Sequence, residues 1–194
     1  MVKIKGPFGN TGIKKSSPIW HDLYKAILSY DPYCKYVVSK LKENNVIEGD
    51  LVLRYARQEF RLGGGVRIGK RTEKGLECDI SPSLYVDCIW DLSHDDGSTC
   101  RIYNEIKSGN IGLPKMLDKY NEYIIDNRAP HLDDIEVEES EKILLIWAWE
   151  EYHKKEPQED YCEIPYKRVN LEVIEPILDD ALRSIGLVKK QDSK

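Results

Sequence analysis

The chain has 194 residues, of which 41% are hydrophobic and 32% are charged, and its formal net charge is −5. This length and balance are typical of a globular protein with a single core, so we expect one domain over residues 1–188 and a disordered tail over 189–194. The longest apolar run, residues 143–149, is too short to cross a bilayer. We therefore expect an intracellular, cytoplasmic protein with no membrane contact.

Cysteine and histidine lack the spacing of a metal site. The five cysteines are odd in number and include no Cys-x-x-Cys pair, which argues against a zinc ribbon and against an iron–sulfur cluster. We expect buried free thiols at Cys34, Cys78, Cys88, Cys100 and Cys162. The histidines are scattered, so we interpret all four as surface or structural residues: His21, His94, His131 and His153.

The first part of the chain is predicted to be helical. Residues 19–44 have the apolar spacing of one or two helices, with core positions at Leu23, Ile27, Tyr30, Val37, Val38 and Leu41. Residues 51–62 are predicted to form a further helix, which the glycines at 63–65 would end. This glycine run does not match a dinucleotide-binding loop or a P-loop, so we interpret it as a bend.

A β-hairpin is predicted near the middle of the chain. It follows two short predicted strands, at residues 66–68 and 76–80, on either side of a basic turn. Residues 84–92 and 100–107 are rich in β-branched and aromatic residues, and residues 93–98 between them are typical of a turn. Since side chains alternate along a strand, one face of the hairpin would belong to the core and the other would be polar. The core face would contain Val86, Cys88, Trp90, Ile102 and Ile106, and the polar face Asp87, Asp91, Arg101, Tyr103, Glu105 and Lys107.

The polar face of this hairpin predicts a metal site. If the turn is centred on Asp96, then Asp87 lies opposite Glu105, with Cβ atoms about 4.5–5.5 Å apart, and Lys107 lies roughly 7 Å further along the same face. Two carboxylates are hard oxygen ligands that suit Mg²⁺ or Mn²⁺, and an ammonium beside them can orient a water or stabilise charge on a phosphate. Asp91 pairs near Arg101 instead, so we expect it to form a surface ion pair.

Helices and buried strands are also predicted downstream. Pro114 can begin a helix that runs to about residue 126, and residues 142–149 have the composition of a buried strand. Residues 163–166 are predicted to form an edge strand. A last helix would begin or bend at Pro176 and end near Ile185.

The motif of the hairpin resembles that of the PD-(D/E)XK nuclease superfamily. Its parts occur in the same order here: Asp87 between two hydrophobic residues, the turn Asp96-Gly97, and the run Glu105-Ile106-Lys107-Ser108-Gly109. The resemblance is closest to the RecB-like branch, with the archaeal Holliday junction resolvases as an alternative, and it covers about a quarter of the chain. It implies an α/β fold with a restriction-endonuclease-like core, in which a mixed central β-sheet is flanked by helices in the order helix, three strands, helix, strand.

The resemblance also implies roles for individual residues. The carboxylates of Asp87 and Glu105 and the backbone carbonyl of Ile106 would hold Mg²⁺ or Mn²⁺. Lys107 would position the attacking water or stabilise the pentacovalent phosphorane, which makes Asp87, Glu105 and Lys107 the catalytic residues. Members of the superfamily often add an acid from the first helix. The candidates for it are Glu59 and, as the second choice, Glu48.

Contacts to nucleic acid are predicted in two places. The helix after the motif often contains Gln-x-x-x-Tyr in this family; here Met116 replaces the glutamine, Tyr120 is retained, and Lys115 or Lys119 could substitute. Between residues 54 and 74 there are seven basic residues and two acidic ones, whereas residues 131–163 contain twelve acidic and three basic residues. The predicted contacts are therefore Arg67, Lys70, Arg71, Lys115, Lys119 and Tyr120.

Taken together, these patterns predict a divalent-metal-dependent deoxyribonuclease that acts in DNA replication, repair or recombination. A dimeric junction-resolving or restriction-like endonuclease and a monomeric RecB-like exonuclease both fit the sequence. The alternative from another class is a non-cleaving module with the same fold, which binds nucleic acid or acts in assembly.

Overall fold

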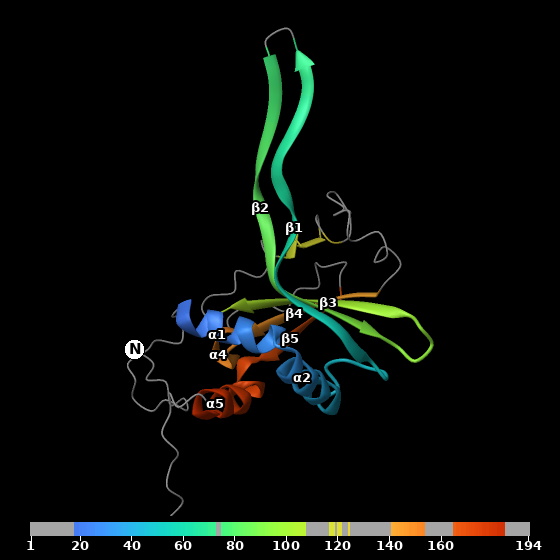
Figure 1. Cartoon of the computed structure of the whole chain (residues 1–194), viewed down its shortest axis with the longest axis vertical. Helices are drawn as coiled ribbons and strands as arrows, with labels where there is room; N and C mark the ends of the chain where they lie inside the picture. Colours follow the sequence, from blue (N-terminus) through green and yellow to red (C-terminus); the bar gives the residue numbers. More distant parts are fainter. Residues whose placement is uncertain are drawn as a thin grey trace, which may run out of the picture.

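The computed structural model describes residues 18–72, 75–107, 117–118, 120–121, 124, 141–153 and 165–184, with backbone alone for residues 18, 19, 61, 63–72, 75–83, 151, 153, 179 and 181–184. Its centre is a mixed sheet of five strands in the order β1-β2-β3-β4-β5 (Figure 1). The bounds are Val52–Thr72 for β1, Gly75–Ser93 for β2, Thr99–Lys107 for β3, Glu141–Ala148 for β4 and Tyr166–Asn170 for β5. The first three strands are antiparallel neighbours, and β3, β4 and β5 are parallel. The predicted α/β class is confirmed.

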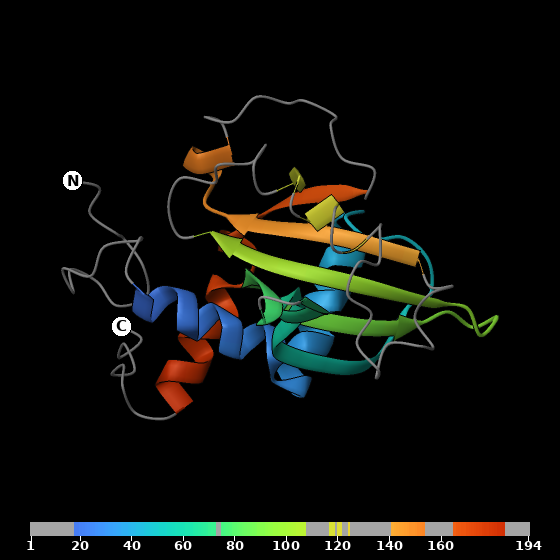
Figure 2. The same cartoon turned by 90° about the horizontal axis from the view of Figure 1, so that it is seen from above.

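Helices cover one face of this sheet. They are α1 (Pro18–Ser29), α2 (Asp31–Glu43) and α5 (Glu175–Ser184), with the short elements α4 (Glu150–His153) and η3 (Leu171–Val173) near the strand ends. Figures 1 and 2 show α1, α2 and α5 on the same side of β3 and β4. The first predicted helical region is divided in two because Tyr30 is extended, with φ −85° and ψ 116°, and a proline follows at the start of α2. Tyr30, expected in the core, is 58% exposed.

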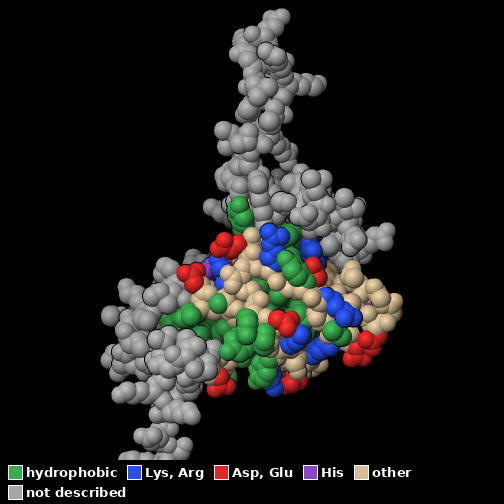
Figure 3. All heavy atoms as spheres, in the orientation of Figure 1, with side chains coloured by type: hydrophobic (Ala, Val, Ile, Leu, Met, Phe, Trp, Pro, Cys, Tyr) green, Lys and Arg blue, Asp and Glu red, His purple; other side chains and the backbone are tan. Residues whose placement is uncertain are grey.

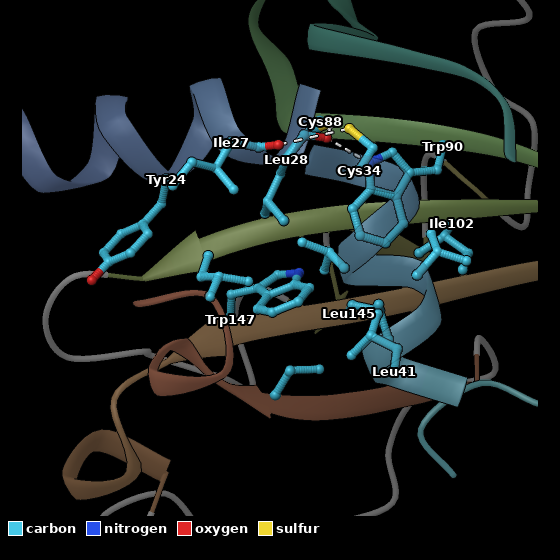
Figure 4. Packing of buried hydrophobic residues seen from close by; sticks show 14 of the residues in the cluster. Tyr24, Ile27, Leu28, Cys34, Leu41, Cys88, Trp90, Ile102, Leu145 and Trp147 are labelled. Atoms are coloured by element: carbon cyan, nitrogen blue, oxygen red, sulfur yellow. Dashed lines mark hydrogen bonds between the residues drawn. The ribbon is translucent and has the colours of Figure 1, made fainter. Parts of the chain in front are cut away.

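The core has two parts, one on each face of the sheet. Between the sheet and the helices, Trp90 and Trp147 meet edge to face with ring centroids 6.3 Å apart (Figure 4). On the other face, Phe60, Ile89 and Tyr103 pack with residues that follow β3 in the chain. The members from that later segment are Leu117, Tyr120 and Ile124. The expected division of the hairpin into a core face and a polar face is therefore wrong, because both faces of β3 are covered.

Helix α1 is fixed to β2 through its last carbonyl groups. Trp90 donates its indole N–H to the carbonyl of Leu28 at 2.5 Å, and the thiol of Cys88 lies 3.0 Å from the same oxygen (Figure 4). These contacts satisfy a carbonyl that has no partner within the helix. Burial raises the pKa of the Cys88 thiol, and the side chains of Cys34 and Cys100 are also buried and free, as predicted for these three cysteines.

The predicted helix over residues 51–62 is wrong, because these residues belong to strand β1. The strand continues through the glycine run, with shifts of register on both sides of Gly63. The short strands predicted at 66–68 and 76–80 exist as parts of this longer hairpin, in which Val66 pairs with Ile80. Local periodicity misidentified the region because pairing with a strand distant in sequence, rather than helix propensity, decides its structure.

The outer part of the β1–β2 hairpin projects from the body of the molecule (Figure 1). We call residues 63–72 of β1 and 75–84 of β2 the arm. Within the described residues, the arm strands pair only with each other. At about 3.3 Å per residue the arm extends roughly 30 Å.

The C-terminal predictions are confirmed in part. Strand β4 matches the predicted buried strand, and β5 begins at Tyr166, the last residue of the predicted edge strand. Helix α5 begins one residue before Pro176, as the sequence indicated. Of the helix predicted from Pro114 to about residue 126, the described residues 117, 118 and 120 are helical. No helix among the described residues combines the length and hydrophobicity needed to cross a membrane.

Candidate functional site

The register of the β2–β3 hairpin is the predicted one. Ser93 pairs with Thr99 and Cys88 with Asn104, so the turn is centred on Asp96. The Asp96 carboxylate accepts hydrogen bonds from the backbone N–H and hydroxyl of Ser98, which fixes the turn locally. The ladder ends at Cys88 and Asn104, so Asp87 and Glu105 are the next residues beyond its last pair.

The hairpin changes direction at Asp87. In the β1–β2 ladder Gln58 pairs with Cys88 and Phe60 pairs with Val86, with Glu59 and Asp87 between them. Glu59 has a φ of 50°, a left-handed conformation that non-glycine residues rarely adopt. Past this point the strand faces are exchanged: Cys88 belongs to the cluster under the helices, whereas Val86 and Phe60 belong to the cluster on the opposite face.

This change of direction leaves Asp87 beside the open edge of β3. The Asp87 Oδ2 atom accepts the backbone N–H of Ile106 at 2.7 Å, so the carboxylate continues the hydrogen bonding where β2 departs. Its Oδ1 atom lies 3.2 Å from Nε2 of His21, on helix α1. The hydrogen bond to Asp87 raises the pKa of His21, although partial burial of the imidazole opposes this effect.

Glu105 is the second acid of the site and is only 7% exposed. The Lys107 ammonium contacts its Oε1 atom, and the Tyr120 hydroxyl donates to Oε2 at 2.5 Å. Burial, followed by the negative charge of Asp87, raises the pKa of Glu105, while Lys107 and Tyr120 act in the opposite direction. Asp87 itself accepts the backbone N–H of Ile106, the residue after Glu105.

Helix α1 contributes a second side chain one turn after His21. The Lys25 ammonium lies 2.7 Å from the Glu59 Oε1 atom. Burial disfavours the charged form of Lys25, but the hydrogen bond to Glu59 and the charge of Asp87 outweigh it and raise its pKa. Because residues four apart share a helix face, His21 and Lys25 together bring α1 to the point where the β1–β2 hairpin bends.

The structure thus brings together the three predicted catalytic residues, Asp87, Glu105 and Lys107. Glu59 is close to them, but on a strand instead of the expected helix, and its carboxylate is 67% exposed and paired with Lys25. Glu48 is elsewhere, in the lining of a pocket of about 370 Å³ that includes His94.

Two further sequence predictions change in the structure. Tyr120 was expected to contact nucleic acid, but it is 2% exposed and holds Glu105. Asp91 forms the expected ion pair with Arg101, with N–O distances of 2.6 and 2.9 Å, yet this is no surface pair, because Arg101 is 5% exposed. The guanidinium also lies over the Phe60 ring at 5.2 Å, so the pair is part of the packing.

The remaining predicted contacts lie in other regions. Arg67, Lys70 and Arg71 are in β1, within the arm. Lys115 and Lys119 lie outside the described residues. His21 was not among the predicted site residues; its one signal in the sequence is the four-residue spacing from Lys25 on a predicted helix.

The donor atoms at the site have the chemistry of a divalent-cation site: two carboxylates, an imidazole and the backbone carbonyl of Ile106. In the described part of the chain, however, no three His, Cys, Asp or Glu side chains are arranged to hold a metal ion. Each oxygen of Asp87 and Glu105 instead has a protein partner.

Comparison of the chain with protein-family models, with curated proteins and with solved structures found no match.

Proposed function

We propose that this protein is a divalent-metal-dependent nuclease that hydrolyses DNA, built on a restriction-endonuclease-like core. The observation that supports it best is the meeting of Asp87, Glu105 and Lys107 where β2 departs from β3. The order of helices, three antiparallel strands and a parallel fourth strand also agrees with such a core. These features support a nuclease acting in DNA replication, repair or recombination.

In this proposal Asp87, Glu105 and the Ile106 carbonyl hold Mg²⁺ or Mn²⁺. The bound cation would supply Lewis acidity and lower the pKa of a water molecule. His21 is a further nitrogen ligand within reach, because its Nε2 atom already lies beside Asp87. The raised pKa of Glu105 means that this acid must lose its proton before it can bind a cation, which favours activity at higher pH.

Lys107 has the most direct role in the proposed chemistry. Lys107 is the last residue of β3 and its side chain is 27% exposed, so the ammonium can reach a phosphate at the surface. A positive charge at this position would orient the attacking water and stabilise negative charge on the phosphorane. The contact with Glu105 keeps the ammonium at the site in the absence of substrate.

The decisive experiment tests cleavage directly. Purified protein is incubated with linear, circular, single-stranded and four-way-junction DNA in Mg²⁺ or Mn²⁺. We expect Lys107→Ala to lose about 10²-fold or more of the cleavage rate, as removal of one group that stabilises transition-state charge commonly does. Asp87→Asn should also be inactive, but excess Mn²⁺ should partly restore it. Asp95→Asn, in the exposed turn, is the matched control; Lys107→Ala cutting at the wild-type rate would refute the mechanism.

One observation favours the non-cleaving module as a second candidate. All four carboxylate oxygens of Asp87 and Glu105 are held by protein groups, as in a purely structural polar cluster. Thermal melting in increasing Mg²⁺ or Mn²⁺ separates the two candidates. A nuclease site should give stabilisation of about 2.7 kcal/mol at a cation concentration 100 times the Kd. In a module without a cation site, the cation should not stabilise the wild-type protein more than it stabilises Asp87→Asn.

A further inference from the structure

The arm and the candidate site are adjacent. The arm begins just beyond Glu59, whose φ is 50°, and Asp87 is three residues from the last arm residue of β2. Figure 1 shows the arm standing out from the sheet at this point. A long ligand bound along the arm would therefore pass the Asp87–Glu105–Lys107 cluster at its root.

Charge is distributed unequally between the two strands of the hairpin beyond Phe60. From Arg61 to Thr72, β1 contains four basic residues and no acidic ones, whereas the returning strand contains Glu77 and Asp79. The basic residues are Arg61, Arg67, Lys70 and Arg71. Within the arm itself, β1 contributes three basic residues and β2 two acidic ones, so in a chain with a net charge of −5 the positive charge of the arm lies along one strand.

The shape of the arm restricts the ligand. An antiparallel ribbon of two strands fits the major groove of B-form DNA, which is about 12 Å wide. Its length of roughly 30 Å is close to one turn of the duplex, which is about 34–36 Å. The major groove of an RNA duplex is too narrow and deep for a ribbon of this kind.

Exposed side chains at the root can continue the contact toward the site. Tyr85 is 50% exposed and lies two residues before Asp87. Arg57 is exposed and lies two residues before Glu59, over the Phe60 ring at 5.8 Å. Figure 3 shows Lys and Arg side chains on the body just below the arm, beside hydrophobic and acidic ones. An aromatic ring and a guanidinium are the groups that commonly hold a base and a phosphate.

We propose that the arm lies in the major groove of double-stranded DNA, with β1 along the phosphates, and directs the backbone to the site at its root. This assignment rests on the proposed nuclease function and specifies its substrate as duplex DNA. The arm would hold the substrate without entering the chemistry, so binding can be measured separately from cleavage.

The test measures binding in EDTA, where a metal-dependent nuclease does not cut. The probes are a DNA duplex of about 30 base pairs, roughly three helical turns, an RNA duplex of the same sequence, and the single DNA strands. We expect the full-length protein to bind the DNA duplex in preference to the RNA duplex and the single strands. In Arg67→Gln/Lys70→Gln/Arg71→Gln the affinity for the DNA duplex should fall about tenfold or more, and the slope of log affinity against log salt should decrease by about 3.

The other strand provides the matched control. Glu77→Gln/Asp79→Asn removes two negative charges from the same arm and should tighten binding to the DNA duplex. A second variant, in which an Asn-Gly turn replaces residues 63–84, should lose the preference for duplex DNA while its melting temperature stays within about 4 °C of the wild-type value. If the triple variant fails to fold, Glu77→Gln/Asp79→Asn and the shortened variant still show whether the arm binds DNA.

Three results would overturn the proposal. The first is an unchanged salt slope in the triple variant. The second is that shortening the arm weakens binding to DNA and RNA duplexes equally. The third is a shortened variant that changes from dimer to monomer while its DNA binding stays unaltered. The last would assign the arm to contact with a second copy of the chain. A wild-type protein that binds through the arm but never cuts would instead count against the nuclease function and leave the arm assignment intact.

Discussion

Both halves of strand β2 pair with β1, but they differ in whether they pack into the core and pair with β3. Residues 86–93 lie between two layers of side chains and also pair with β3 from Cys88 onward. Residues 75–84 form the arm, which pairs only with β1 among the described residues. The candidate site lies at the boundary, where Asp87 of β2 is held by Ile106 of β3 and His21 of α1, and the buried Glu105 by Lys107 and Tyr120.

This contrast can be tested first by its effect on stability. Trp90 is fully buried, donates to the Leu28 carbonyl and packs on Trp147. Trp90→Ala should lower the free energy of unfolding by about 3–5 kcal/mol. Tyr85→Ala, five residues away on the same strand but half exposed, should change it by about 0.5 kcal/mol or less. Urea unfolding of both variants measures the difference; equal losses would contradict the division of β2 into two environments.

The sequence was informative where local chemistry determines structure. The turn residues around Asp96 fixed the register, which pairs β2 with β3 as far as Cys88 and Asn104, the residues beside Asp87 and Glu105. Strand β1 was misidentified because its partner is distant in sequence and its pairing overrides local periodicity. The contact of His21 with Asp87 depends on how α1 packs against β2, which no local pattern encodes.

The next test concerns the charge of Glu105. Burial and the nearby Asp87 raise its pKa, so the folded protein binds this proton more tightly than the unfolded chain does. The stability associated with protonated Glu105 is therefore complete below the ordinary pKa of 4.5 and is lost as pH rises through the folded value. Glu105→Gln cannot lose a proton, so its melting temperature relative to wild type should increase with pH by a few degrees. A constant difference from pH 4 to pH 8 would contradict the raised pKa.

The pair between His21 and Asp87 gives a smaller effect with the same sign. The raised pKa of His21 means that its stabilising contribution is complete below 6.5 and is lost as pH rises through the folded value. At pH 5.5, His21→Gln should cost about 1 kcal/mol, discounted for partial exposure, and the cost should decrease toward pH 9. In an Asp87→Asn background the same substitution should cost almost nothing at either pH. If His21→Gln still lowers the free energy of unfolding by about 1 kcal/mol in the Asp87→Asn protein, His21 stabilises the fold by packing alone.

The smallest effect on stability is expected from shortening the arm. A two-stranded ribbon without a further layer contributes little net stability, because its pairing only offsets the entropy of ordering the strands. Replacing residues 63–84 by an Asn-Gly turn, which suits a tight hairpin, should change the free energy of unfolding by about 1 kcal/mol or less. The body half of β2, from Val86 onward, retains its contacts with both core clusters in this variant. A loss as large as that of Trp90→Ala would show that the arm is part of the folding unit. The two halves of β2 would then contribute equally to the free energy of unfolding, although only one of them projects from the body.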